Sequence, residues 1–86
     1  MNKTNNLNKT VVTEIEFGNI NMKLDDIMTK RNISTYELSS KANVRFQTIK
    51  SLRENKATRI DFNVLAKLCY VLECKVEDLI EYKNNR

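Results

Sequence analysis

Proline and histidine are absent from this 86-residue chain, and glycine occurs once, as Gly18. Because tight β-turns draw heavily on glycine and proline, their scarcity argues against a turn-rich β-fold and favours a helical one. Without histidine, the common zinc-binding patterns and the usual general base are missing. The sequence also lacks a glycine-rich phosphate-binding loop and an evident catalytic pair of carboxylates. We therefore expect a helical protein that is not an enzyme and uses no cofactor.

Cysteine is also scarce, with Cys69 and Cys74 the two examples. Two thiolates supply half of an all-cysteine tetrahedral zinc site, so a metal at these residues would require a dimer. Cys69 falls on the predicted inward face of a helix, where a thiol is usually inert. We interpret both side chains as reduced thiols in or near the core.

Long apolar runs are missing, so no segment has the length of a membrane span. The first ten residues are polar and lack the apolar core of a signal peptide. We expect a cytoplasmic protein with no membrane partner and no evident small-molecule ligand. The length is typical of one domain, and so short a chain buries a modest fraction of its surface, which leaves its stability thin.

The N-terminal part of the chain changes character near residue 10. Residues 1–10 are rich in Asn, Lys and Thr and predict a flexible tail. Residues 11–18 alternate apolar and polar side chains, which predicts a strand with one apolar face. No second strand is evident, so we hypothesise that this strand pairs with its counterpart in a second subunit. An arm packed on its own domain and a disordered segment are the alternatives.

From Ile20 onward the apolar spacing becomes helical. Asp61 is a suitable N-cap for the longest of the helices. A break at residues 73–75 precedes the last helix, and the polar end of the chain predicts a tail at residues 83–86. The sequence predicts five helices, at residues 20–31, 35–42, 46–53, 62–72 and 76–80.

The second and third helices are separated by a short corner with clear signals. Ser34 and Glu37 form a capping box, in which Ser34 caps the helix and Glu37 reaches back. Ile33 and Leu38 are spaced as the hydrophobic staple that accompanies it. Asn43 follows the helix and tolerates the positive φ that a tight corner needs. Two short helices joined in this way are typical of a helix-turn-helix unit.

The chain from Met22 to Tyr82 resembles the Cro/CI-type (XRE-like) helix-turn-helix family of phage and bacterial repressors. The resemblance covers about 60 of the 86 residues. It rests on the segments Asn32–Leu38, Asn43–Ile49, Leu65–Leu72 and Cys74–Ile80. It implies an all-α domain of five helices at residues 19–82, preceded by the flexible tail and the short N-terminal strand or arm, and it implies double-stranded DNA as the partner.

The resemblance implies that the third helix is the recognition helix, with base-reading side chains at its start and on its outer face. Helical geometry agrees, because burying Ile49 and Leu52 turns the opposite side of this helix outward. Glutamine can bond adenine at two points, serine and threonine can reach several bases, and phenylalanine can meet a thymine methyl. The candidate base-reading residues are Phe46, Gln47, Thr48 and Ser51.

Positive charge is concentrated around this helix. Between Lys41 and Arg59 the chain carries six basic residues against Glu54 alone, whereas residues 73–82 carry four acidic residues against Lys75 alone. Basic side chains that neutralise phosphates add affinity without reading sequence. Thr35 matches the family position that binds a phosphate at a helix start. The candidate phosphate-binding residues are Thr35, Arg45, Lys50, Asn55, Lys56 and Arg59.

Several positions depart from the family pattern. Asn43 and Asn55 replace common glycines and keep the capacity for positive φ. Arg45 stands where a capping Ser or Thr is usual, which removes an N-cap worth about 1 kcal/mol. Arg53 occupies a frequent Glu position and Met28 the position of its frequent Arg partner. We therefore expect the buried ion pair of many relatives to be absent.

The sequence thus predicts a sequence-specific regulator, a repressor, that reads the major groove as a homodimer. One recognition helix contacts few bases, and two half-sites one helical turn apart overcome this limit. Residues 11–18 or the last helices are the candidate interface. A protein-interaction module of the same fold, such as an antitoxin-like or adaptor component, and a DNA-architectural factor in excision or replication are the alternatives.

Overall fold

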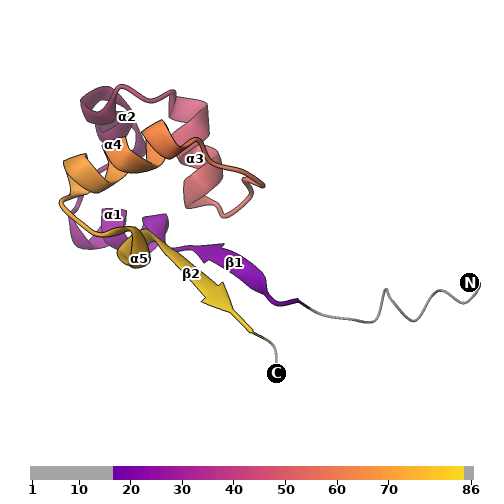
Figure 1. Ribbon diagram of the computed structural model, residues 1–86. Coiled ribbons are helices and arrows are strands. Elements are labelled where there is room, and N and C mark those ends of the chain that lie inside the picture. The colour runs from indigo at the N-terminus through magenta and orange to yellow at the C-terminus, as the bar shows by residue number, and fades with distance from the viewer. Residues whose placement is uncertain (1–16, 85–86) are drawn as a thin grey trace, which may run out of the picture.

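The computed structural model describes residues 17–84, which form five helices and two short strands. The strands run side by side away from the body that the helices form (Figure 1). This arrangement confirms the five-helix helix-turn-helix fold that the sequence predicts. The elements are β1 (Asn19–Met22), α1 (Leu24–Lys30), α2 (Thr35–Ala42), α3 (Phe46–Arg53), α4 (Phe62–Leu72), α5 (Val76–Leu79) and β2 (Ile80–Lys83).

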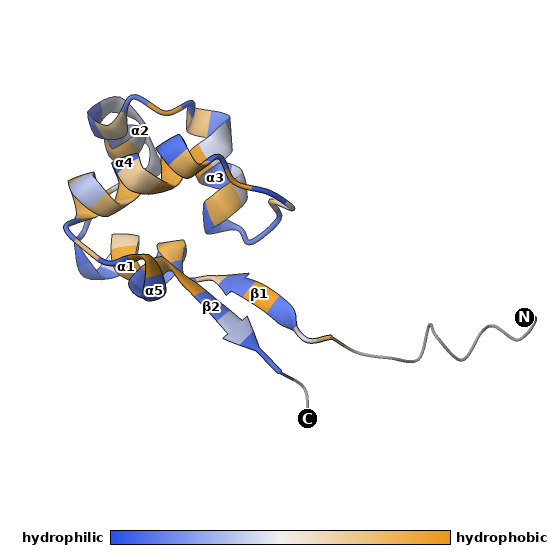
Figure 2. Cartoon of the chain, viewed as in Figure 1, coloured by the Kyte–Doolittle hydropathy of each residue, from blue (hydrophilic) through white to orange (hydrophobic). Residues whose placement is uncertain are grey.

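All five helices contribute to one apolar core, and their apolar residues turn toward one another (Figure 2). The longest helix, α4, runs through the middle of this core, where Leu68 is fully buried. The buried apolar side chains are Leu24, Met28, Leu38, Ala42, Val44, Ile49, Leu52, Leu68, Leu72 and Leu79. Between residues 17 and 84, no helix combines the length and the apolar character needed to cross a bilayer.

The corner between α2 and α3 follows the predicted local signals. The Ser34 hydroxyl accepts a hydrogen bond from the Glu37 backbone N–H at 3.0 Å, which caps α2. Asn43 ends α2 in the left-handed region, with φ of 54°, and the next residue, Val44, is buried. The second half of the predicted capping box is wrong, because the Glu37 carboxylate pairs with Lys41 on the same helix. The exposed α2 surface favours that pair, four residues apart.

The strand assignments need correction. The predicted strand at residues 11–18 lies largely outside the described residues, and its last two, Phe17 and Gly18, are not in a strand. The observed strands, β1 and β2, pair antiparallel, with Asn19 opposite Lys83 and Met22 opposite Ile80. The predictions of helix from residue 20, of helix at Ile80 and of a tail from residue 83 are therefore wrong, because these residues lie in β1 and β2. Four residues are too few to establish a period of two, and the partners are 60 or so positions apart.

The single glycine has a structural reason in this two-stranded sheet. Gly18 precedes β1 with φ of 80°, a conformation that side chains rarely adopt. A Cβ atom at this position would collide with the Lys83 carbonyl oxygen and contact the Tyr82 ring. The Tyr82 hydroxyl donates a hydrogen bond to the Phe17 carbonyl at 2.6 Å, directly across this close approach. Glycine thus allows the chain entering β1 to lie against the end of β2.

Candidate nucleic-acid interface

The outer face of α3 carries the candidate base-reading residues. Ile49 and Leu52 fix the rotation of the helix, because both are buried in the core. Gln47 is consequently exposed, and Thr48 and Ser51 are half-buried at the edge of the same face. The structure therefore orients these three side chains as the sequence analysis expects.

A groove runs between α3 and the loop that leads to α4. It gathers residues from both segments, which lie close together because the loop folds back beside the helix (Figure 1). Six of the ten predicted site residues line it, and Thr58, which the sequence analysis did not single out, lines it as well. Its position between two predicted phosphate-binding residues is the one signal that pointed to it. The six are Arg45, Gln47, Thr48, Ser51, Lys56 and Arg59.

The two arginines of this groove are available for a ligand. Arg45 immediately precedes α3 and makes no side-chain capping bond, as its departure from the family pattern predicts. Neither Arg45 nor Arg59 forms an ion pair within residues 17–84, and both side chains are exposed. Phe46 lies at the start of α3, 46% exposed and outside the core, but does not line the groove.

Two of the predicted phosphate-binding lysines share one carboxylate. The Lys50 ammonium lies 2.9 Å from one oxygen of Glu54, and the Lys56 ammonium lies 3.6 Å from the other. The hydrogen bond from Lys50, with smaller contributions from both lysine charges, lowers the pKa of Glu54. Glu54 therefore remains ionised and holds both lysines beside the C-terminal end of α3.

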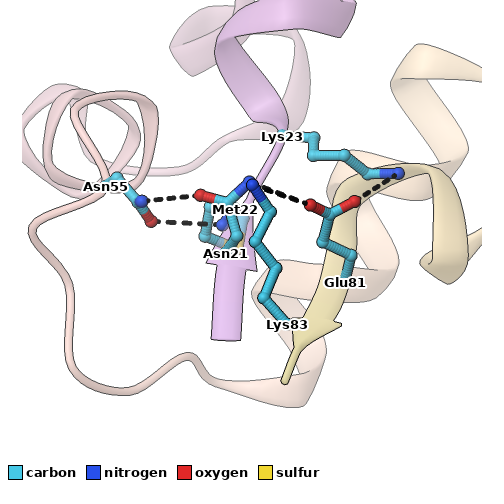
Figure 3. Close-up of polar contacts among 6 residues, drawn as sticks. All are labelled: Asn21, Met22, Lys23, Asn55, Glu81 and Lys83. Carbon is cyan, nitrogen blue, oxygen red and sulfur yellow. Dashed lines mark hydrogen bonds and ion pairs between the residues drawn. The ribbon is translucent and has the colours of Figure 1, made fainter. Parts of the chain in front are cut away.

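Asn55 has a structural role that the sequence analysis did not foresee (Figure 3). It follows α3 in the left-handed region, with φ of 61°, as its replacement of a glycine predicts. Its amide is turned toward β1, where the Oδ1 atom accepts the Met22 backbone N–H at 3.1 Å. The Nδ2 group donates to the Asn21 Oδ1 atom at 2.8 Å. Asn55 therefore attaches the end of α3 to the two-stranded sheet.

Replacing Asn55 with alanine is expected to lower the free energy of unfolding by about 2 kcal/mol. The change removes two hydrogen bonds and leaves a β-carbon in the left-handed region. Asn55→Gly, which removes the same bonds and relieves the backbone, is expected to cost about half as much. Urea unfolding of the two variants separates the contribution of the amide hydrogen bonds from the cost of the left-handed backbone. An alanine variant as stable as the wild type would show that the amide contributes nothing.

Thr35 lies at the start of α2 beside a guanidinium group from α3. The Arg53 side chain donates to the Thr35 hydroxyl at 3.1 Å and pairs with Asp25 of α1 at 2.5 Å. Met28 is fully buried, so the buried ion pair of many relatives is absent, as predicted from this position. A more exposed pair between Arg53 and Asp25 connects the same two helices instead. Arg53 is not among the predicted phosphate-binding residues, and its guanidinium group, paired with Asp25, lies beside Thr35.

Both cysteines are free thiols at the C-terminal end of α4. They are half-buried against the core, as expected, and the Cys74 backbone N–H bonds the Cys69 carbonyl where the helix ends. Partial burial, followed by the neighbouring Cys69 group, raises the pKa of the Cys74 thiol. A raised pKa leaves less thiolate at neutral pH, which lowers the reactivity of Cys74 as a nucleophile.

Known proteins are similar to this chain in sequence and in fold. A family model described as the Cro/C1-type HTH DNA-binding domain matches residues 23–85. The uncharacterized HTH-type transcriptional regulator YozG of Bacillus subtilis (strain 168) is 30% identical over 64 residues, which are 74% of this chain and 76% of YozG.

Solved structures extend the comparison. SinR, the master regulator for biofilm formation, in complex with DNA has a TM-score of 0.60 and 25% identity, covering 64% of this chain and 87% of that one. The transcriptional regulator VanUg has a TM-score of 0.65 and 24% identity, covering 83% and 93%, and shows the shared fold. The family match, the relative and the helix-turn-helix geometry lead to one conclusion: this chain belongs to the Cro/C1-type helix-turn-helix family of DNA-binding transcription regulators.

Proposed function

We propose that this protein is a repressor that binds a specific double-stranded DNA site as a homodimer, with α3 in the major groove. The observation that carries the proposal is the groove between α3 and the following loop. Within it, polar side chains suited to base edges lie beside arginines that are free of ion pairs with the described residues. SinR, a structural neighbour, has been solved in complex with DNA.

The proposed roles divide between reading and positioning. Gln47, Thr48 and Ser51 face outward from α3 and contact base edges, with Phe46 at the first turn of the helix. Positioning on the phosphates falls to residues around the helix and at the start of α2, and Asn55 acts through its backbone because its amide is bonded to β1. The phosphate-binding set is Thr35, Arg45, Lys50, Asn55, Lys56 and Arg59.

The distribution of charge supports the proposed orientation, in which α3 faces the DNA. The charged residues from α3 to the start of α4 are mostly basic, whereas the first turn of α5 carries the acidic pair Glu77 and Asp78. Phosphate contacts release condensed counterions, so the basic side provides affinity and the acidic side does not. The molecule would therefore approach DNA with α3 and its following loop first, and with α5 directed away.

Selection from a random pool of duplex DNA tests the proposal. The purified protein is expected to enrich a pseudo-palindromic site with half-sites about 10 bp apart. Affinity for the enriched site should fall steeply between two salt concentrations, because several phosphates are contacted. Failure to enrich any sequence would contradict the proposed function. Repression is tested separately, by transcript levels from a promoter carrying the enriched site.

Replacing Glu54 with glutamine is expected to raise the affinity for random DNA several-fold at low salt. Glu54 holds the Lys50 and Lys56 ammonium groups, and a phosphate must compete with it for them. Freeing both lysines is also expected to steepen the plot of log affinity against log salt concentration, by about 0.9 for each added phosphate contact. Fluorescence anisotropy with a labelled random duplex measures both quantities.

Glu77→Gln is the matched control for this experiment. It makes the same change in net charge at an exposed position on α5, away from α3. A specific effect of Glu54 predicts a larger gain than the control produces. Equal gains from the two variants would show that net charge alone matters and that Glu54 does not compete with phosphate.

A protein-interaction role is the second candidate, because two aromatic side chains of α4 are exposed. Phe62 and Tyr70 are 82% and 85% exposed, and they lie eight residues apart on that helix. SinR has also been solved in complex with the SinI protein. Weak dependence of DNA affinity on salt, together with no enriched sequence, would favour this role over DNA reading.

A further inference from the structure

The two-stranded sheet has two outer edges, and they differ. On the outer edge of β1, the Met22 backbone N–H is bonded to the Asn55 amide at 3.1 Å. Asn55 and its loop therefore occupy this edge near the helical body. β2 follows directly from α5 and runs outward to Lys83, with Tyr82 59% exposed. Figure 1 shows β2 extending away from the helices alongside β1. The outer edge of β2 is the one that a further strand can reach.

The pairing pattern determines which backbone groups point to that edge. Residues directly opposite in an antiparallel pair alternate between hydrogen-bonded and non-hydrogen-bonded positions. The Lys23 N–H bonds the Leu79 carbonyl at 2.7 Å, which continues the register of the strands and makes this a hydrogen-bonded position. By alternation, Glu81 and Lys83 bond to β1, whereas the N–H and carbonyl groups of Tyr82 point outward.

The side chains along this edge are self-complementary. If a second β2 strand lies antiparallel with Tyr82 opposite its own counterpart, Glu81 lies opposite Lys83 of the second copy, and Lys83 opposite its Glu81. Both pairs occupy non-hydrogen-bonded positions, where side chains approach most closely. Opposite charges directly across an antiparallel pair are stabilising. Two favourable charge pairs therefore form about one two-fold axis, and Tyr82 exchanges both backbone hydrogen bonds with its counterpart.

The same register aligns the exposed apolar side chains. Ile20 is opposite Tyr82 in the sheet, and both are 59% exposed. Pairing two copies about Tyr82 would place Ile20, Tyr82 and their two counterparts in one row on one face of a four-stranded sheet. Association would thus bury apolar surface that the single chain leaves in water, and would pair the open edge.

We infer that a second copy of this chain binds along the outer edge of β2, with Tyr82 at the two-fold axis. The inference concerns the dimer itself and requires no DNA. It supplies the two-fold symmetry on which the proposed reading of two half-sites depends, and it differs from pairing through residues 11–18. A monomer that still selected a DNA site would contradict this inference and leave groove reading intact.

The first measurement is the mass of the full chain in solution without DNA. Sedimentation velocity from micromolar to millimolar concentration is expected to show a dimer that dissociates on dilution. A monomer throughout this range would overturn the inference. A dimer alone does not identify the surface, because the exposed side of α4 or the residues before Phe17 could also associate.

Two single charge reversals then test the interface and its register. Glu81→Lys puts lysine opposite Lys83 in its own homodimer, and Lys83→Glu puts glutamate opposite Glu81. Each homodimer is expected to be at least about tenfold weaker than the wild type, because two charge pairs become repulsive. Mixing the two variants restores opposite charges at both pairs, so the mixture is expected to form heterodimers preferentially. Mass spectrometry under native conditions distinguishes them when one variant is isotopically labelled.

The mixing experiment has an internal control, because the charges within each chain are the same before and after mixing. Glu37→Lys and Lys41→Glu are the matched control variants. Each reverses one charge of the Glu37–Lys41 ion pair on α2, which measures 3.4 Å, and mixing them is expected to give no preference for heterodimers. The double variant Glu81→Lys, Lys83→Glu is expected to recover most of the affinity lost by the single variants, since opposite charges return across the interface, although the lysine introduced at position 81 then faces Lys23 in its own chain. Circular dichroism monitors folding throughout. A wild-type dimer with neither heterodimer preference nor recovery in the double variant would overturn the inference.

Discussion

Replacing Leu68 with alanine is expected to lower the free energy of unfolding by about 3 kcal/mol. Leu68 lies at the middle of α4 and is fully buried among side chains from the other helices. The change removes its transfer free energy and leaves a cavity that the helical body closes only partly. A domain of this size has a total stability of about 4 to 13 kcal/mol, so the loss is a large fraction of it. We expect the midpoint of thermal unfolding to fall by about 15 °C.

Tyr70→Ala is the control on the same helix, because Tyr70 is 85% exposed. An exposed position away from specific features is expected to change stability by no more than about 0.5 kcal/mol. Calorimetry or urea unfolding compares the two variants under identical conditions. If the Leu68 and Tyr70 variants lost equal stability, the burial assigned to α4 would be wrong, or Tyr70 would be buried in an assembly.

Local sequence signals predicted the helices well because their causes are local. The Ser34 and Asp61 caps each lie within three residues of the N–H group that they bond, at 3.0 and 2.6 Å. Asn43 and Asn55 have positive φ because asparagine is the usual substitute for glycine there. These features depend on neighbours in the chain, so a single sequence contains the information.

The two-stranded sheet was missed because its cause is not local. Ile20 and Tyr82 become neighbours only after the helices have packed and brought β1 beside β2. Each strand is four residues long, too short for its alternation to stand out against the helical pattern beside it. The longer alternation at residues 11–18 drew the strand prediction instead, and most of it lies outside the described residues.

For the candidate site, too, the sequence predicted the features with local causes and missed those that depend on distant residues. The outward orientation of Gln47 follows from the burial of Ile49 and Leu52, which helical spacing makes visible. The contacts of Lys50 and Lys56 with Glu54 were not predicted, although the four-residue spacing of Lys50 and Glu54 is a known signal for an ion pair on a helix. The Asn55 amide was beyond prediction, since it bonds a strand whose existence the sequence did not indicate.

Replacing Gln47 with alanine is expected to weaken binding to the selected DNA site by about 10- to 100-fold and leave binding to random DNA nearly unchanged. An outward-facing glutamine near the start of α3 can bond an adenine edge at two points, which is worth about 1 to 3 kcal/mol of discrimination.

The matched control for Gln47→Ala is Arg59→Ala, in the same groove. Arg59 is exposed and forms no ion pair within residues 17–84, so its proposed role is to neutralise a phosphate. Its loss should weaken both kinds of binding similarly and reduce the slope of log affinity against log salt concentration by about 0.9. Titrations of both variants against the selected and a scrambled duplex, at two salt concentrations, separate reading from positioning. Discrimination that survived Gln47→Ala would show that another residue reads the base, and discrimination lost with Arg59→Ala would move that role to the loop after α3.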